Sequence, residues 1–115
     1  MSSVDFPTAT NLELTTSLQT LYTVPSTTGI ILRNALVKVT NYSNATRLVD
    51  VYGVANTGTS SASNADAYQL AVPPKDYVII PIKRLAASAF IQAKADAASA
   101  LTLGLLAGDL YTPGA

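Results

Sequence analysis

Four aspartates are the side chains of this sequence best suited to acid–base chemistry. Asp50, Asp66, Asp76 and Asp96 are well separated along the chain. A glycosidase needs two carboxyl groups held at a fixed gap across a sugar, and nothing in the spacing of these four pairs them. Asp66 and Asp76 fall in segments rich in turn residues, where Asp is common. We therefore interpret these aspartates as solvated surface residues.

Other patterns of catalytic or ligand-binding residues are missing. The chain contains no His and no Cys, which excludes Cys/His zinc sites, thiol nucleophiles and the Ser-His-Asp triad. Asn64-Ala65-Asp66 offers two oxygen ligands but lacks the remainder of a calcium loop, and the glycines form no phosphate-binding pattern. We expect no catalytic residue, no metal and no cofactor, and predict that the protein is not an enzyme.

The charge balance indicates a protein that works inside an assembly. Seven Lys and Arg balance seven Asp and Glu among 115 residues, and only 12% of residues are charged. A nucleic-acid binder shows a basic stripe, whereas Lys83-Arg84 is the one adjacent basic pair, interpreted as a solvated strand end. No apolar run reaches the roughly 20 residues of a membrane span, and residues 1–5 do not resemble a secretory signal. A net charge near zero suits an assembled protein better than a free monomer.

Tyrosine is the one enriched aromatic residue, and it supplies the candidate interface. Six of the eight aromatic residues are Tyr, and Tyr is favoured where a surface is half apolar and half polar. Tyr42 lies in a turn and Tyr52 alternates with Val51, so both are interface candidates. Three further candidates lie near the ends of the chain: Val4, Phe6 and Tyr111. Three tyrosines beside apolar residues are assigned to the core instead: Tyr22, Tyr68 and Tyr77.

The elements that must position these residues are predicted to be strands. Residues 48–54 alternate Val49 and Val51 with Asp50 and Tyr52, which is the period of a strand. Residues 55–67 form a long loop of Gly, Ser, Thr, Asn and Ala, a type that is often functional. Pro81 directs its strand to a sheet edge, and the imperfect alternation after Gly29 fits a bend or bulge. The remaining strand-type runs are 12–24, 29–41, 68–72 and 77–82, and turns separate them.

Residues 85–106 admit two interpretations. Their Ala and Leu content favours a helix by propensity, and apolar residues also recur at every fourth position. However, Ile91, Ala93 and Ala95 alternate with polar residues, and Leu101, Leu103 and Leu105 do the same. We favour two strands with a hairpin hinge at residues 98–99.

Together these elements predict an all-β protein. About seven or eight short strands, with turns at intervals of about ten residues, are typical of an antiparallel β-sandwich or jelly roll. We expect an extended N-terminal arm over residues 1–11, a sandwich over 12–106 and a C-terminal tail over 107–115.

Four segments carry a resemblance to a known class of proteins: Leu18-Gln-Thr-Leu-Tyr-Thr-Val-Pro25, Val39-Thr-Asn-Tyr-Ser-Asn-Ala-Thr46, Val49-Asp-Val-Tyr52 and Ile91-Gln-Ala-Lys-Ala-Asp-Ala-Ala-Ser-Ala-Leu-Thr-Leu103. This rhythm of strands and turns resembles the capsid decoration, or cement, proteins of tailed bacteriophages. It also resembles small tail-fibre and tail-tip modules. The resemblance extends over most of residues 12–106 and includes no catalytic signature.

The resemblance implies that the protein functions by binding to the surface of an assembled capsid. Decoration proteins are β-sandwich domains that sit on the outer surface of the capsid as dimers or trimers and staple neighbouring capsid subunits. By this resemblance the partners are the major capsid protein and further copies of the chain. The location is the virion surface, after synthesis in the host cytoplasm. The alternative is a receptor- or carbohydrate-binding module of a phage tail, which would use the 55–67 loop and exposed tyrosines.

Overall fold

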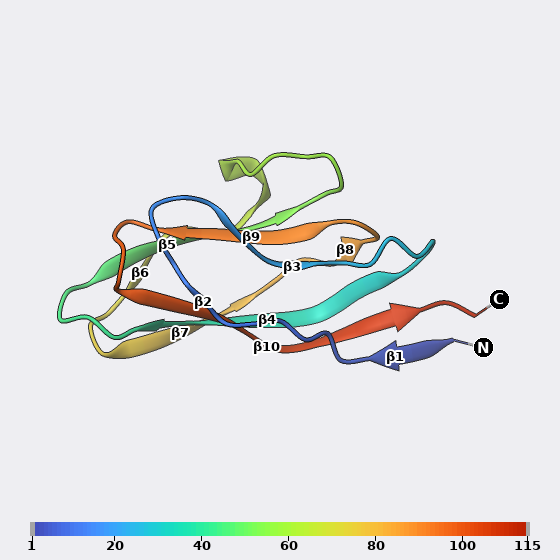
Figure 1. The fold of residues 1–115 in the computed structure, drawn as a ribbon, viewed down its shortest axis with the longest axis horizontal. Coiled ribbons are helices and arrows are strands. Elements are labelled where there is room, and N and C mark those ends of the chain that lie inside the picture. Colours follow the sequence, from blue (N-terminus) through green and yellow to red (C-terminus); the bar gives the residue numbers. More distant parts are fainter. Residues whose placement is uncertain (1, 115) are drawn as a thin grey trace.

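The chain forms two antiparallel β-sheets that pack face to face. The computed structural model describes residues 2–114. The larger sheet contains β1 (Ser3–Asp5), β2 (Leu12–Glu13), β4 (Ile31–Asn41), β7 (Asp76–Pro81), β8 (Leu85–Ala86) and β10 (Leu101–Thr112). The smaller sheet contains β3 (Gln19–Thr23), β5 (Arg47–Val54), β6 (Ala65–Val72) and β9 (Phe90–Ala95). Figure 1 shows the smaller sheet over the larger one, with both termini at the same end. The predicted all-β sandwich is confirmed.

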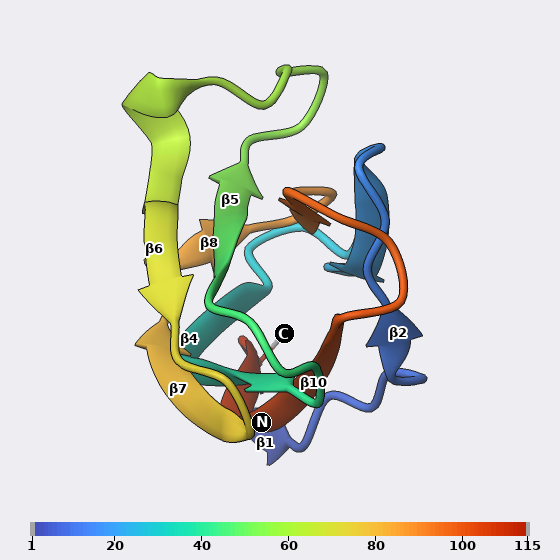
Figure 2. The same cartoon turned by 90° about the vertical axis from the view of Figure 1, so that its left-hand side faces the viewer.

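Strand order explains how the layers are connected. The larger sheet has the order β1-β10-β4-β7, with β2 beside β10 and β8 beside β4, and the smaller sheet has the order β3-β9-β5-β6. Most connections therefore cross from one sheet to the other. Figure 2 shows β6 next to β7 on one side of the sandwich, where the chain passes between the layers. No helix within residues 2–114 is long and apolar enough to cross a membrane.

The core lies between the two sheets and follows from the two-residue period of the strands. Along β4, Val37 and Val39 are fully buried, and Leu101 and Leu103 of β10 are buried beside them. Ile91 of β9 reaches the same core from the smaller sheet. One face of each sheet thus packs into the core, and the other face is available to contact loops, solvent or partners.

The strand predicted over residues 12–24 is two strands in different sheets. β2 pairs with β10 and β3 pairs with β9, so the chain crosses the sandwich between them. A turn closed by the Thr15 hydroxyl, which accepts a hydrogen bond from the Ser17 amide at 3.2 Å, makes the crossing. Thr occurs in the turn itself as well as in β3, so strand propensity alone did not reveal the break.

Residues 85–106 are strands, as the local alternation predicted, but the predicted hairpin is wrong. β9 pairs with β3 and β5, whereas β10 pairs with β1, β2 and β4. The hinge at residues 98–99 therefore connects the two sheets instead of closing a hairpin within one. Both Ile91 and Leu103 point into the core from opposite layers, which buries more apolar area than a two-stranded ribbon would.

The terminal segments are parts of the larger sheet. β1 lies within the predicted arm and pairs with β10, with Val4 opposite Tyr111. β10 continues to Thr112, so residue 106 is not a boundary and residues 107–112 are not a free tail. Met1 and Ala115, the outer limits of the predicted arm and tail, lie outside the described residues.

Two local predictions for the larger sheet are confirmed. β7 pairs only with β4 in the sheet order and is an edge strand, where the missing amide of Pro81 is tolerated. The start of β4 is irregular: Asn34 has a φ of 55°, and the register with β10 shifts between Leu105 and Asp109. This bulge changes the direction of the Arg33–Asn34 segment.

Candidate functional site

The outer face of the larger sheet carries exposed apolar side chains along its length. On β7, Tyr77 is 51% exposed and Ile79 is 46% exposed, and both alternate with residues that pack on the core. β10 is an inner strand of this sheet, so Leu106, which is 51% exposed, must also point outward. Val4 is 53% exposed and shares the face of Tyr111, its register partner. We call this surface the docking face and define it by Val4, Tyr77, Ile79, Leu106 and Tyr111.

Phe6 extends the docking face at the N-terminal edge. It follows β1 directly and is 83% exposed, the largest exposed fraction of any large apolar side chain in residues 2–114. An exposed Phe gains favourable free energy when a partner covers it. The structure thus brings three of the predicted interface residues to one end of the molecule: Val4, Phe6 and Tyr111.

Cations lie over the aromatic rings of this face. The Arg33 guanidinium lies 4.9 Å from the centroid of the Tyr111 ring, and the Lys38 ammonium lies 4.4 Å from the centroid of the Tyr77 ring. Such contacts hold an aromatic ring in a defined orientation. The docking face therefore carries apolar side chains on β1, β7 and β10, has Lys38 and Thr40 of β4 between them, and bears positive charge beside two of its rings.

Tyr42 lies at the other end of the sandwich. Its side chain is 41% exposed, and its hydroxyl donates a hydrogen bond to Glu13 Oε1. This bond, then burial and the negative charge of Glu13, raise the pKa of Tyr42. Lys75 Nζ donates to the Tyr42 carbonyl oxygen at 2.7 Å. Tyr42 is accessible, as predicted, but it is remote in the register from Tyr111.

Tyr52 is not an interface residue, because it is only 4% exposed. Its register partner in β9 is Gln92, and Ser60 of the long loop donates to Gln92 Oε1 at 2.7 Å. The loop therefore lies over this part of the outer face of the smaller sheet. Burial, followed by the charge of Asp50, raises the pKa of Tyr52 to about 12. The alternation of residues 48–54 was correct, but it could not show that a loop covers the second face.

Of the three tyrosines that were assigned to the core, one packs against it and two are exposed. Tyr22 packs against the core, and burial raises its pKa. Tyr68 and Tyr77 are 54% and 51% exposed, so their assignment to the core is wrong. Both stand on the outward side of edge strands, and their apolar neighbours in sequence point the other way.

Two of the four aspartates are held in polar networks and are not solvated, contrary to the prediction. The side chain of Asp50 is 12% exposed. It accepts hydrogen bonds from the Gln69 amide at 2.6 Å and from the Tyr52 hydroxyl at 3.1 Å, while Lys94 Nζ lies 4.0 Å from it. Asp76 and Asp96 are exposed, as predicted.

Asp66 faces a side-chain cation. Lys83 Nζ lies 3.1 Å from Asp66 Oδ2 and donates to the carbonyl oxygens of Asn64 at 2.7 Å and Gly53 at 3.2 Å. The oxygens of the Asn64-Ala65-Asp66 segment are thus occupied by an ammonium group. The side chain of Asp66 is 10% exposed. Residues 2–114 contain no group of three His, Cys, Asp or Glu side chains that could hold a metal ion.

The long loop is held by its own hydrogen bonds and is shorter than predicted. The 3-10 helix η1 (Ala62–Asn64) ends it, and β6 begins at Ala65. The Asn64 side chain donates to the Thr59 carbonyl oxygen at 2.8 Å and accepts from the Ser61 amide at 3.0 Å. A cavity of about 720 Å³ lies between this loop and residues 83–89, and its lining includes Asn56, Thr59 and Ala87.

No protein-family model and no curated protein sequence matches this chain.

Proposed function

We propose that this chain is a structural protein of a phage particle. It is a capsid decoration protein that binds the outer surface of the shell through the docking face and staples neighbouring major capsid subunits. The observation that carries the proposal is the set of exposed apolar side chains on the larger sheet and its N-terminal edge, from Val4 and Phe6 to Tyr77 and Ile79. Larger exposed apolar surfaces of this kind are typical of protein–protein contact sites.

The geometry suits a rigid docking module. On β7 and β10 the exposed side chains stand on strands whose opposite faces are packed into the core, so their positions are fixed before binding and little ordering entropy is lost. A standard interface buries on the order of 800 Å² per partner. A protein that binds the assembled shell and not the free subunit stabilises the assembled state by mass action.

The resemblance of residues 12–106 to capsid decoration proteins supports the choice of partner. The low charge of the chain, with 12% charged residues, is consistent with a contact dominated by apolar and uncharged polar groups. Many copies of a modest contact, repeated over a shell, act together through multivalency.

Co-sedimentation with assembled shells tests the proposal. Ile79→Asp replaces an exposed apolar side chain of the docking face with a carboxylate beside its register partner Lys38. We expect it to weaken shell binding by about tenfold or more, because apolar contact area is lost and charged groups must be desolvated in the contact. Leu48→Asp is the matched control, since Leu48 is 37% exposed on the smaller sheet and alternates with the buried Val49. Unchanged binding of Ile79→Asp, with the fold intact by circular dichroism, would contradict the proposal.

A receptor- or carbohydrate-binding module of a phage tail is the second candidate. The cavity of about 720 Å³ beside the long loop favours it, because the loop presents the Asn56 amide and the Thr59 hydroxyl there. Glycan-array binding that is lost in Asn56→Ala would support this candidate. A blank array, together with shell binding by the docking face, would exclude it.

A further inference from the structure

β7 is an edge strand whose sequence favours pairing with a further strand. It pairs with β4 on one side and with no strand of residues 2–114 on the other. The run Tyr77-Val78-Ile79-Ile80 is uncharged and consists of residue types with high strand propensity. Open edges of this composition add strands from other chains. The edge is therefore suited to pairing with a second copy of this chain unless its backbone groups are blocked.

The hydrogen bonds to β4 determine which backbone groups of β7 point to the free side. The Ile82 amide donates to the Ala35 carbonyl oxygen at 2.8 Å, and these two residues continue the register of the β4–β7 pair. In an antiparallel pair, residues that bond to the partner strand alternate with residues whose backbone groups point away from it. The backbone groups of Tyr77, Ile79 and Pro81 therefore point to the free side of β7.

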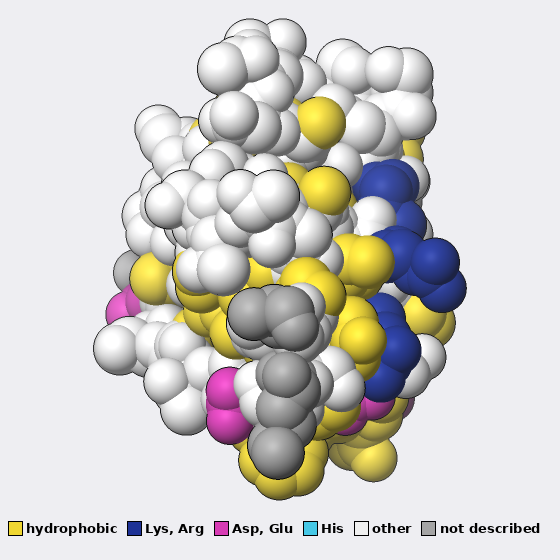
Figure 3. Space-filling view, turned by 90° about the vertical axis from the view of Figure 1, so that its right-hand side faces the viewer, with side chains coloured by type: hydrophobic (Ala, Val, Ile, Leu, Met, Phe, Trp, Pro, Cys, Tyr) yellow, Lys and Arg dark blue, Asp and Glu magenta, His cyan; other side chains and the backbone are white. Residues whose placement is uncertain are grey.

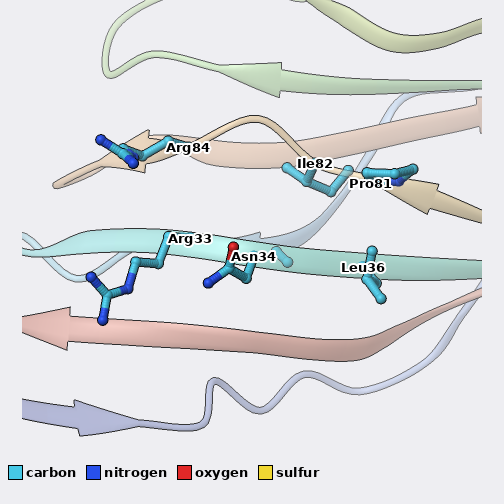
Figure 4. A pocket seen from close by; sticks show the side chains of 7 residues that line it. Arg33, Asn34, Leu36, Pro81, Ile82 and Arg84 are labelled. Carbon is cyan, nitrogen blue, oxygen red and sulfur yellow. The ribbon is translucent and has the colours of Figure 1, made fainter.

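Tyr77 and Pro81 offer no free amide hydrogen on that side. The Tyr77 amide donates to Asp76 Oδ1 at 2.8 Å, so the preceding side chain already satisfies it. Pro81 has no amide hydrogen, and Figure 4 shows it where β7 ends, across from Leu36 of β4. Among the outward residues of β7, Ile79 alone keeps an amide that a second strand could bind.

The edge is also short, because the pairing with β4 is interrupted after Ile82. β8 pairs with β4 at Ile31 and Leu32, and a groove of about 470 Å³ separates the two pairings, lined in part by Arg33 and Arg84. Arg84 is exposed. Figure 3, which looks at the end of the molecule that carries the termini, shows Lys and Arg side chains gathered along one side. Short edge strands with charged residues beside them resist strand addition.

Asp76 and Pro81 act on the same pair of residues in the pairing that two β7 strands would form. When the outward residues of two copies face each other in antiparallel order, Ile79 lies opposite Ile79, and Tyr77 lies opposite Pro81. The central Ile79 pair exchanges both of its backbone hydrogen bonds. Each Tyr77–Pro81 pair gains none, because the Tyr77 amide is already bonded and Pro81 has no donor. Only the central contact remains.

We propose that Asp76 and Pro81 block β7 against strand addition by a second copy of this chain. The block acts on the edge of the larger sheet and leaves the side chains of Tyr77 and Ile79 on the outer face accessible to a partner. The inference goes beyond the proposed function and does not rest on it, because it follows from backbone groups that a contact with the docking face does not use.

Sedimentation velocity of full-length variants over a range of concentrations tests the block. Asp76→Ala frees the Tyr77 amide, and Pro81→Val supplies the missing donor. The double variant Asp76→Ala/Pro81→Val is therefore expected to associate about tenfold or more tightly than wild type, because the outer pairs regain their hydrogen bonds. Asp76→Asn is the control for the lost charge. It keeps an oxygen that accepts from the Tyr77 amide, and it is expected to associate like wild type.

Ile79→Pro distinguishes pairing by the β7 edge from association by any other surface. The Ile79 amide does not bond to β4, so proline is tolerated there, but it removes the last outward donor. Added to the double variant, Ile79→Pro is expected to return association to the wild-type value. A folded double variant that associates no more tightly than wild type, or a gain in association that survives Ile79→Pro, would overturn the block.

Amide hydrogen exchange gives a second readout that does not depend on association. Relative to its intrinsic rate, the Tyr77 amide is expected to exchange more slowly in wild type than in Asp76→Ala, because the carboxylate accepts its hydrogen bond. Equal rates in the two proteins would contradict the role of Asp76. Shell binding by Ile79→Asp is a separate measurement of the outer face, so failure of the block and failure of the proposed function are distinguishable.

Discussion

Asn41 is predicted to be the polar side chain on which the stability of the sandwich depends most. It ends β4 of the larger sheet, is 0% exposed, and is the one buried polar or charged residue among those described. Its amide donates to the carbonyl oxygen of Val72 in the smaller sheet at 3.0 Å and to that of Ala45 at 2.8 Å. Its Oδ1 accepts from the Ser43 amide at 2.9 Å and from the Ser43 hydroxyl at 2.7 Å. One side chain thus joins the two sheets and the turn between them.

The loss of unfolding free energy in Asn41→Ala depends on which of the former hydrogen-bond partners of Asn41 water can reach in the variant. Val72 is 0% exposed, so its carbonyl oxygen loses its donor in a buried place, at a cost of about 1–3 kcal/mol. Ser43 and Ala45 are accessible and recover hydrogen bonds from water, so each of those bonds contributes at the lower end of the usual about 0.5–1.5 kcal/mol. We expect a total loss of about 3 kcal/mol in the free energy of unfolding, or roughly 10 °C in Tm.

Urea unfolding followed by circular dichroism measures this loss, with Asn44→Ala in the same exposed turn as the control. Asn41→Asp keeps the acceptor but faces a carboxylate toward two carbonyl oxygens. Its penalty is expected to be larger at neutral pH and to shrink in acid, because the neutral carboxyl is favoured there. A loss below about 1 kcal/mol in Asn41→Ala, or neutral-pH stability of Asn41→Asp equal to wild type, would refute the reasoning.

Three further predictions concern stability. Burial raises the pKa of Tyr52 from 10.0 to about 12. The folded state therefore favours the neutral phenol, and this stabilisation is present below pH 10 and is lost as the pH rises through about 12. In pH-dependent unfolding, Tyr52→Phe should lose less stability than wild type over that range. Leu103 is 0% exposed, and Leu103→Ala should cost about 2–5 kcal/mol in denaturant unfolding, whereas a loss near zero would mean that the core is assigned wrongly. A Cβ added at Gly53 would lie 2.9 Å from Asp66 Oδ2 and 3.0 Å from Lys83 Nζ. Gly53→Ala should therefore separate this ion pair and lower Tm, and an unchanged Tm would contradict the packing.

Alternation along single strands was the part of the fold that the sequence revealed. Ile91, Ala93 and Ala95 alternate with polar residues because one face of β9 is core, and this pattern outweighed the helical propensity of alanine. Which strands pair with which was not readable, because pairing depends on contacts between distant parts of the chain. Val4 and Tyr111, for example, are neighbours in the sheet but lie at opposite ends of the sequence.

The candidate site was predictable only in part, for a related reason. Exposed apolar residues near a terminus, such as Val4 and Phe6, can be noticed from composition and position. The alternation of polar and apolar residues shows that Tyr52 and Tyr77 each point to one side of their strand. It does not show whether that side is covered by a loop, covered by the second sheet or exposed. Arg33 and Arg84 line one groove because β7 and β8 pair with separate parts of β4, and no short-range pattern marks the gap between these two pairings.

Imaging of phage particles by electron cryo-microscopy, with and without this chain, tests the central claim most directly. The proposed function predicts density for the sandwich repeated over the outer surface of the shell, with the docking face of the larger sheet turned toward the capsid subunits. Density only at the tail, or on no particle at all, would contradict it.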